Sequence, residues 1–167
     1  MPNWCRNSIT IHHNDLEMLN KFVAASNDGC IAKTFCPEPN PAKNTMTSEQ
    51  YDWRIENWGT KWDFGVEDLQ NEDMNTVYGY IDTAWTPPVG VYHALKALGF
   101  RIDAIWLGDG DEFAGRFKDG KVSEYHDIDL DYLDEIDPAI VEAFGLDERE
   151  RFDDEEEGDD VEGSETD

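Results

Sequence analysis

Hydrophobic and polar positions alternate near the start of the chain, which is the pattern of a strand that buries one face. Ser8 and Thr10 interleave with Ile9 and Ile11 there. Other short runs are rich in β-branched and aromatic residues, which favour a pleated surface. Four strands are predicted on this basis, at residues 5–13, 31–36, 76–85 and 100–107.

Two further segments place their apolar residues at helical spacing. Leu16, Leu19 and Phe22 follow Asn14, which stands where a helix N-cap belongs. A second apolar face begins after a Pro-Pro pair and ends at a glycine, the residue types that open and close helices. Helices are therefore predicted at residues 15–25 and 88–98.

The order of these elements predicts an α+β fold with a ferredoxin-like split βαβ topology. In that topology a four-stranded antiparallel sheet carries both helices on one face. Asp119-Gly120 between two alternating runs predicts a β-hairpin over residues 112–125 that extends the sheet. Residues 37–75 do not fit the pattern and are interpreted as a tryptophan-rich insertion, with a short helix after Ser48.

Charge divides the chain unevenly. The formal net charge is −26, of which residues 1–122 contribute −7 and residues 123–167 contribute −19. We therefore expect three parts: a ferredoxin-like domain over residues 1–126, an acidic and partly helical extension over 127–151, and an acidic tail over 152–167. The tail is too poor in apolar residues to offset the entropy of ordering, so disorder is expected there.

This charge limits the classes of partner. A strongly negative surface repels phosphate backbones and attracts basic proteins, including those that bind DNA or RNA. Direct nucleic-acid binding is therefore not expected, although acidity can also serve only solubility or adaptation to salt. An odd number of cysteines, no signal-peptide pattern and no apolar stretch of about 20 residues predict a soluble, cytoplasmic protein that does not enter membranes.

Four separated motifs together suggest a family. MPNWCRNSITI at the N-terminus, NWGTKWD at 57–63, AWTPP at 84–88 and EFAGRF at 112–117 resemble the YubB-like ferredoxin-like family of phage and plasmid proteins. The resemblance covers about residues 1–125. It implies a mobile-element origin, a ferredoxin-like fold without an iron–sulfur cluster, and a role in contest or cooperation with a bacterial host. It implies no particular activity.

Metal and cofactor motifs are not recognised. Cys5, Cys30 and Cys36 form no C-x-x-C pair and are too few for an iron–sulfur cluster, so structural thiols are expected. The aspartates that begin at Asp127 imitate the start of a calcium loop, but Tyr132 stands where that loop needs glycine. His12 and His13 are adjacent in a strand and must point to opposite faces, so one is expected to be buried and one exposed. No metal and no cofactor are predicted.

Two groups of residues are candidate sites. The first is a contact or ligand cluster consisting of Trp53, Trp58, Lys61, Trp62 and Asp63. Its indoles could stack a ligand ring, or they could form a small core that fastens the insertion to the sheet. In the second case the indoles of Trp58 and Trp62 are buried and Lys61 is exposed, which is the expected arrangement.

The second candidate site is a partner-binding acidic face on the ordered part of the chain. Its predicted members are Asp109, Asp111, Glu112, Asp127, Asp129, Asp131, Asp134 and Glu135. Acidic and apolar residues alternate in these segments, so the carboxylates should emerge on one side.

Three functions remain open from sequence. The first is a nucleic-acid-mimicking inhibitor that occupies the basic groove of a host defence or DNA-processing protein, such as a restriction or CRISPR component. The second is an interaction or regulatory module without mimicry. The third is a small enzyme or nucleotide binder that uses the segment from Trp58 to Asp63, with Asp63 or an exposed histidine as acid or base. No catalytic pair is recognised, so no catalytic residue is assigned.

Overall fold

A computed structural model describes residues 3–41 and 45–148 and has a mixed α+β fold around one antiparallel sheet. The strands are β1 (Trp4–His12), β2 (Glu67–Asn71), β3 (Thr76–Ala84), β4 (Arg101–Gly108), β5 (Phe113–Lys118) and β6 (Lys121–His126). The helices are α1 (Leu16–Asn27), α2 (Ile31–Phe35), α3 (Ser48–Asn57), α4 (Val89–Ala97) and α5 (Pro138–Phe144), with 3₁₀ turns η1 (Asp109–Asp111) and η2 (Leu130–Glu135).

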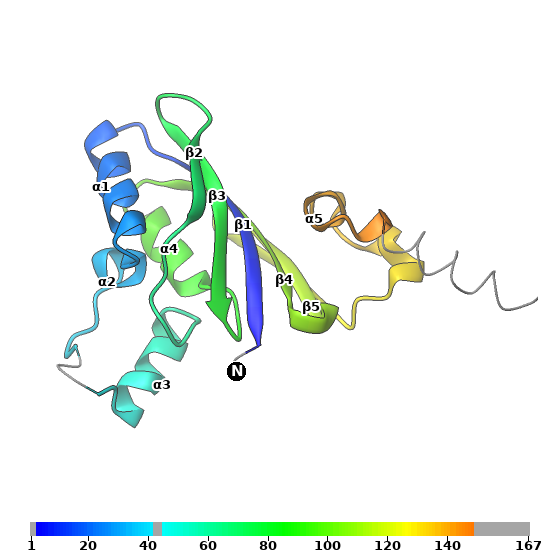
Figure 1. Ribbon diagram of the computed structural model, residues 1–167, viewed down its shortest axis with the longest axis horizontal. Coiled ribbons are helices and arrows are strands. Elements are labelled where there is room, and N and C mark those ends of the chain that lie inside the picture. Colours follow the sequence, from blue (N-terminus) through cyan, green and yellow to red (C-terminus); the bar gives the residue numbers. More distant parts are fainter. Residues whose placement is uncertain (1–2, 42–44, 149–167) are drawn as a thin grey trace, which may run out of the picture.

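The sheet has the order β2-β3-β1-β4-β5-β6, with β1 near its centre. Strand β1 pairs antiparallel with both β3 and β4, and Ile9 lies opposite Gly79 and Ala104. The alternation that predicted β1 is visible in its burial, since Cys5, Ile9 and Ile11 are buried toward the helices. Helices α1, α2 and α4 cover that face of the sheet and enclose the main core (Figure 1).

The predictions for β1, β3, β4, α1 and α4 are confirmed, with ends that differ by one or two residues. The hairpin is confirmed as well, as β5 and β6. Its turn residues Asp119 and Gly120 both have positive φ, 49° and 91°, as a two-residue hairpin turn requires. The predicted helix after Ser48 is α3, which begins with a capping box between Thr47 and Gln50.

The predicted strand at 31–36 is wrong, because this segment forms helix α2. Ile31, Ala32 and Phe35 are its buried residues, and they lie on one helical face against the main core. The first backbone N–H groups of the helix find their acceptor in Asp63, which comes from a distant part of the chain. Because this acceptor is distant in the sequence, the β-branched and aromatic residues of the segment alone favoured a strand.

One edge of the sheet is formed by β2, which lies inside the region interpreted as a tryptophan-rich insertion. Strand β2 pairs antiparallel with β3, and its register shifts between Glu67 and Gln70. Its residues are almost all exposed, so β2 has no hydrophobic alternation from which it could have been predicted. Pairing with β3 therefore defines this strand.

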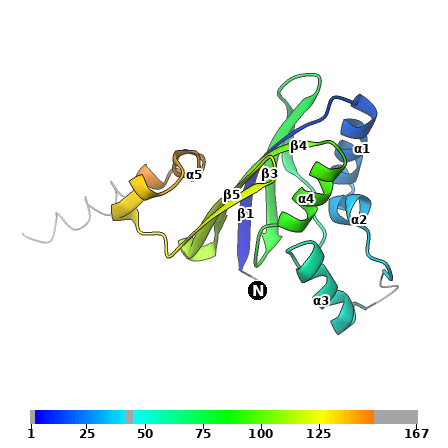
Figure 2. The same cartoon turned by 180° about the vertical axis from the view of Figure 1, so that it is seen from behind.

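The residues after the hairpin return to the opposite face of the sheet. Figure 2 shows α5 on the side of the sheet away from α1, α2 and α4. There it contributes to a second apolar core with the outward residues of β4 and β5. The expected extension over 127–151 is thus packed on the sheet as far as residue 148. The expected disordered tail, residues 152–167, lies outside the described residues.

Candidate functional site

Two stretches of the predicted acidic face lie side by side. The N–H of Asp127, just after β6, donates a hydrogen bond of 2.9 Å to the C=O of Glu112, just after η1. This bond closes the ladder at the end of the hairpin, next to the pair Phe113 and His126. The members whose side-chain exposure is described are all exposed: Asp109, Glu112, Asp127, Asp129, Asp131, Asp134 and Glu135.

Three of these carboxylates surround one hollow. Asp127, Asp129 and Glu135 line a cavity of about 220 Å³ together with His126 and Tyr132. Two local features determine how the chain turns here. Asp127 has a left-handed backbone, φ 53°, and the carboxylate of Asp129 accepts a hydrogen bond from the N–H of Asp131 at 3.0 Å, which caps η2.

A second apolar core supports the acidic face from below. Its buried members come from both the sheet and the extension: Leu107, Ala114, Ile136, Ile140 and Leu146. Ile128, Leu130 and Leu133, which alternate with the acidic residues, pack against this core. The alternation of acidic and apolar residues in the sequence therefore corresponds to an exposed layer of carboxylates over a buried apolar layer.

Arg116 links the extension to the sheet through two carboxylates. Its guanidinium donates two hydrogen bonds to Asp103, of 2.8 and 2.7 Å, and two to Asp137, of 2.9 and 3.3 Å; Asp137 is the N-cap of α5. Burial by itself would raise the pKa of Asp137, but the hydrogen bonds from Arg116 and from the N–H of Ala139 outweigh it and lower that pKa. Hydrogen bonding to Asp103 likewise raises the pKa of Arg116. The bidentate pair with Asp103 joins β5 to β4, and the bonds to Asp137 hold the start of α5 against these strands.

The tryptophan-rich cluster is divided between the interior and the surface. Trp58 is fully buried, as predicted; its indole N–H donates to the C=O of Cys36 at 2.7 Å, and Arg54 stacks 4.8 Å from its ring. Trp53 meets Trp58 edge to face, with ring centroids 6.0 Å apart. This part of the cluster packs the insertion onto the main core.

The prediction for Trp62 and Lys61 is wrong. Trp62 is 39% exposed and packs against the exposed ring of Trp4, with centroids 6.0 Å apart. Lys61 is half-buried, because its ammonium group lies 5.0 Å from the Trp62 ring and 5.8 Å from the Tyr51 ring. Trp62 lies beside the start of β1, where it contacts Trp4, an aromatic partner that sequence spacing does not indicate.

Asp63 caps a helix. Its carboxylate accepts hydrogen bonds from the N–H groups of Ala32 at 2.7 Å, Lys33 at 3.0 Å and Phe64 at 2.9 Å. All three bonds satisfy backbone groups, two of them at the start of α2. Trp58 and Asp63 therefore both have structural roles. In the part of the chain that the structure describes, they do not line a common cavity.

The thiols and histidines also have structural surroundings. Burial raises the pKa of Cys5 to about 12, and burial likewise raises the pKa of Cys36. His13 is buried against Phe100, and His12 is half-buried with a hydrogen bond to Thr76. Among residues 3–41 and 45–148, no three His, Cys, Asp or Glu side chains are grouped to hold a metal ion.

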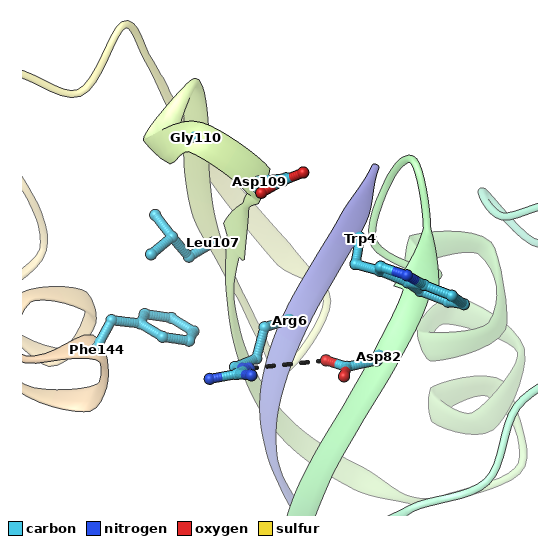
Figure 3. A pocket seen from close by; sticks show the side chains of 8 residues that line it. Trp4, Arg6, Asp82, Leu107, Asp109, Gly110 and Phe144 are labelled. Carbon is cyan, nitrogen blue, oxygen red and sulfur yellow. Dashed lines mark ion pairs between the residues drawn. The ribbon is translucent and has the colours of Figure 1, made fainter. Parts of the chain in front are cut away.

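Sequence reasoning missed a groove on the open part of the sheet face (Figure 3). One cavity of about 410 Å³ and another of about 350 Å³ share Arg6, Asp82 and Phe144. Arg6 and Asp82 lie opposite each other on β1 and β3, and Phe144 comes from α5. The alternation of residues along β1 would have placed Arg6 on this face. The position of α5 beside Arg6 could not be predicted, because no local sequence pattern indicates it.

Comparisons of this chain with protein-family profiles, with curated proteins and with solved structures find no match. In the described ranges, none of the helices combines the length and apolar character needed to cross a bilayer.

Proposed function

We propose that this protein binds a basic, nucleic-acid-binding protein and presents carboxylates where that partner expects phosphates. One observation carries the proposal: the acidic face rests on a packed base, formed by the second apolar core and the Arg116 link. A phosphate mimic needs charges at fixed spacing, since the phosphates of DNA recur about every 1.7 Å along the axis. Carboxylates on a mobile segment would attract a basic groove without matching its shape.

The charge around this base supports the same proposal. Residues 127–148 contain nine acidic residues and no lysine or arginine. Among them Asp137 is engaged by Arg116, whereas Asp127, Asp129, Asp131, Asp134 and Glu135 are exposed. A surface of this kind repels nucleic acid and complements a basic groove.

We further propose that the scaffold is ferredoxin-like and that the protein comes from a phage or plasmid. The antiparallel strand order β2-β3-β1-β4, with α1 and α4 on one face, supports the ferredoxin-like topology. The hairpin β5–β6 then extends the sheet, and the extension covers the β4 and β5 part of its second face. The mobile-element origin follows from the resemblance of the four motifs. The partner would then be a host defence or DNA-processing protein such as a restriction or CRISPR component, met in the host cytoplasm.

A second candidate function is a protein-interaction module that uses exposed tryptophans. Trp4, Trp62 and Trp85 are 45%, 39% and 49% exposed, and we call them the aromatic patch. Trp85 adjoins the end of β3, where its N–H bonds the C=O of Asn3, and it has φ 75°, which is unusual for a bulky residue. Exposed tryptophans are typical of the centres of protein interfaces.

The proposal is tested with a partner captured from host lysate and then used in a competition assay against DNA or RNA. The decisive variant replaces Asp127, Asp129 and Asp131 by asparagine, which removes three charges. Asparagine also suits the left-handed backbone of Asp127 and the capping position of Asp129. A matched control removes three charges elsewhere, at the exposed Asp52, Glu56 and Glu72.

Mimicry predicts that the acidic-face variant loses about tenfold or more of its inhibition, whereas the control variant and a truncation after Phe152 keep most of it. Equal losses in the acidic-face variant and the control would mean that inhibition depends only on total charge, which would contradict the proposal. A Trp62→Ser variant distinguishes the second function, since loss of capture there, with the acidic-face variant unaffected, would identify the aromatic patch as the contact.

A further inference from the structure

The groove on the open sheet face shares one residue, Asp109, with the predicted acidic face, and its other lining residues are different. Its two cavities, about 410 and 350 Å³, meet at Arg6 and Asp82 and lie within the usual size range of ligand pockets, roughly 300–1,000 Å³. Strands β1 and β3 form its floor, and Phe144 of α5 forms one wall (Figure 3). Strand β2 contributes the opposite rim through Glu67 and Asp68.

Carboxylates outnumber cations along this groove. Asp82 lies on the floor, Asp109 on one rim, and Glu67 and Asp68 on the other. Among the described residues, 3–41 and 45–148, Arg6 is the one basic residue that lines either cavity. The local charge therefore favours a cationic occupant and disfavours phosphate or another anion.

Arg6 is weakly held in the groove. The closest approach between Arg6 and Asp82 is 3.8 Å, longer than a charge-assisted hydrogen bond, and the Arg6 side chain is 67% exposed. By contrast, the neighbouring Arg116 binds Asp103 at 2.7 Å with two parallel bonds. The carboxylate of Asp82 can therefore exchange Arg6 for another cation at little cost.

Aromatic side chains complete the surroundings. Tyr80, 47% exposed, lies on the floor beside Asp82, Trp4 stands at the end of the groove, and Phe144 faces Arg6 from α5. Carboxylates combined with accessible aromatic faces bind guanidinium groups through ion pairs and cation–π contacts. On the far rim, Asp68 has a left-handed backbone with φ 50° at the register shift of β2, a place where strand irregularities redirect side chains.

We propose that this groove binds an arginine side chain carried on an extended segment of the partner, with Asp82 as its main acceptor. The inference rests on the proposed function for the basic character of that partner. It adds a specific anchor beside the acidic face, because an arginine that enters the groove displaces Arg6 from Asp82 and stacks against Tyr80 or Phe144. Charge complementarity selects a basic protein segment as the occupant.

The test uses the full chain, labelled with ¹⁵N, and a blocked peptide, Ac-Gly-Ser-Arg-Gly-Arg-Ser-Gly-NH₂, followed by NMR titration. The control peptide carries citrulline, a neutral isostere, in place of both arginines. We expect the arginine peptide to shift amides of β1, β3 and α5 around Arg6, Asp82 and Phe144, and the citrulline peptide to shift none of them.

Two pairs of variants make the test specific. Asp82→Asn should weaken peptide binding about tenfold, as the loss of a charged acceptor predicts, whereas Asp52→Asn, an exposed site on α3, should change it less than about threefold. Arg6→Gln should strengthen binding, because it removes the cation that competes for Asp82. Arg101→Gln removes the same charge at the far end of β4 and should have less effect.

Shifts confined to residues 127–135, equal effects of Asp82→Asn and Asp52→Asn, or no shifts at millimolar peptide would each overturn the groove assignment. None of these outcomes affects the competition assay, so the proposed function is tested independently of the groove. Conversely, arginine binding in the groove together with full inhibition by the acidic-face variant would support the groove and refute phosphate mimicry.

Discussion

Asp63 and Asp127 are both acidic residues in polar stretches of the sequence, yet their carboxylates have different surroundings. Asp63 accepts three backbone hydrogen bonds, two of them from Ala32 and Lys33 of helix α2, which lie about 30 residues earlier in the chain. The side chain of Asp127 is exposed beside other carboxylates. Residue type and spacing could predict the exposed cluster, but the role of Asp63 depends on the fold and could not be predicted.

Replacing Asp63 by alanine should therefore reduce stability and leave partner binding intact. The change removes the acceptor of three backbone N–H groups, so the free energy of unfolding should fall by roughly 1–3 kcal/mol. Urea unfolding, followed by the fluorescence of the buried Trp58, measures this loss. Asp52→Ala, at an exposed position, is the control. Unchanged stability combined with lost binding would instead indicate that Asp63 contacts a ligand.

At the scale of elements, the sequence predicted those whose pattern is local. Strand β1 alternates, α1 has a clear apolar face, and the Asp119-Gly120 turn defines the β5–β6 hairpin. The N-cap of α1 is Asp15, one residue after the predicted Asn14. Helix α2 could not be predicted, since it has five residues and its N–H acceptor is supplied by Asp63. Strand β2 is polar and exposed, and only its pairing with β3 makes it a strand.

The docking of α5 can be tested by a substitution that changes no charge. Ile140 is fully buried in the second apolar core, so Ile140→Ala should weaken the packing of the extension by about 2–5 kcal/mol. Hydrogen exchange should then show faster exchange of α5 amides than in the parent chain. If the acidic face must be held in place, inhibition of the partner should fall as well, although every carboxylate remains.

The matched control for this experiment is Ile31→Ala, which makes the same change at a fully buried site of the main core. It should lower global stability without selectively exposing α5, and the remaining folded protein should inhibit normally. Full inhibition by Ile140→Ala, despite rapid exchange in α5, would mean that the carboxylates do not need a fixed base.

At the scale of the whole molecule, the sheet has an apolar core on each face, and the acidic extension belongs to one of them. The main core, between the sheet and α1, α2 and α4, holds the scaffold, and the second core carries the acidic extension on the other face. Alternation of acidic and apolar residues predicted that these carboxylates would be exposed, as the described ones are. The groove was not predictable, because it arises only where α5 lies beside the uncovered parts of β1 and β3.

This arrangement predicts that the tail and the acidic face act on different rate constants of partner binding. Residues 153–167 contain ten acidic and no basic residues, and charge remote from the contact steers encounter without shaping the complex. Truncation after Phe152 should therefore lower the association rate constant about tenfold at low ionic strength, with little effect at high salt, and leave dissociation nearly unchanged. The acidic-face variant should chiefly accelerate dissociation, because its charges make the fixed contacts. Surface plasmon resonance with the captured partner, at several salt concentrations, measures both constants. If truncation instead speeds dissociation as much as the acidic-face variant does, the tail itself contacts the partner, and the fixed carboxylates are not the main binding element.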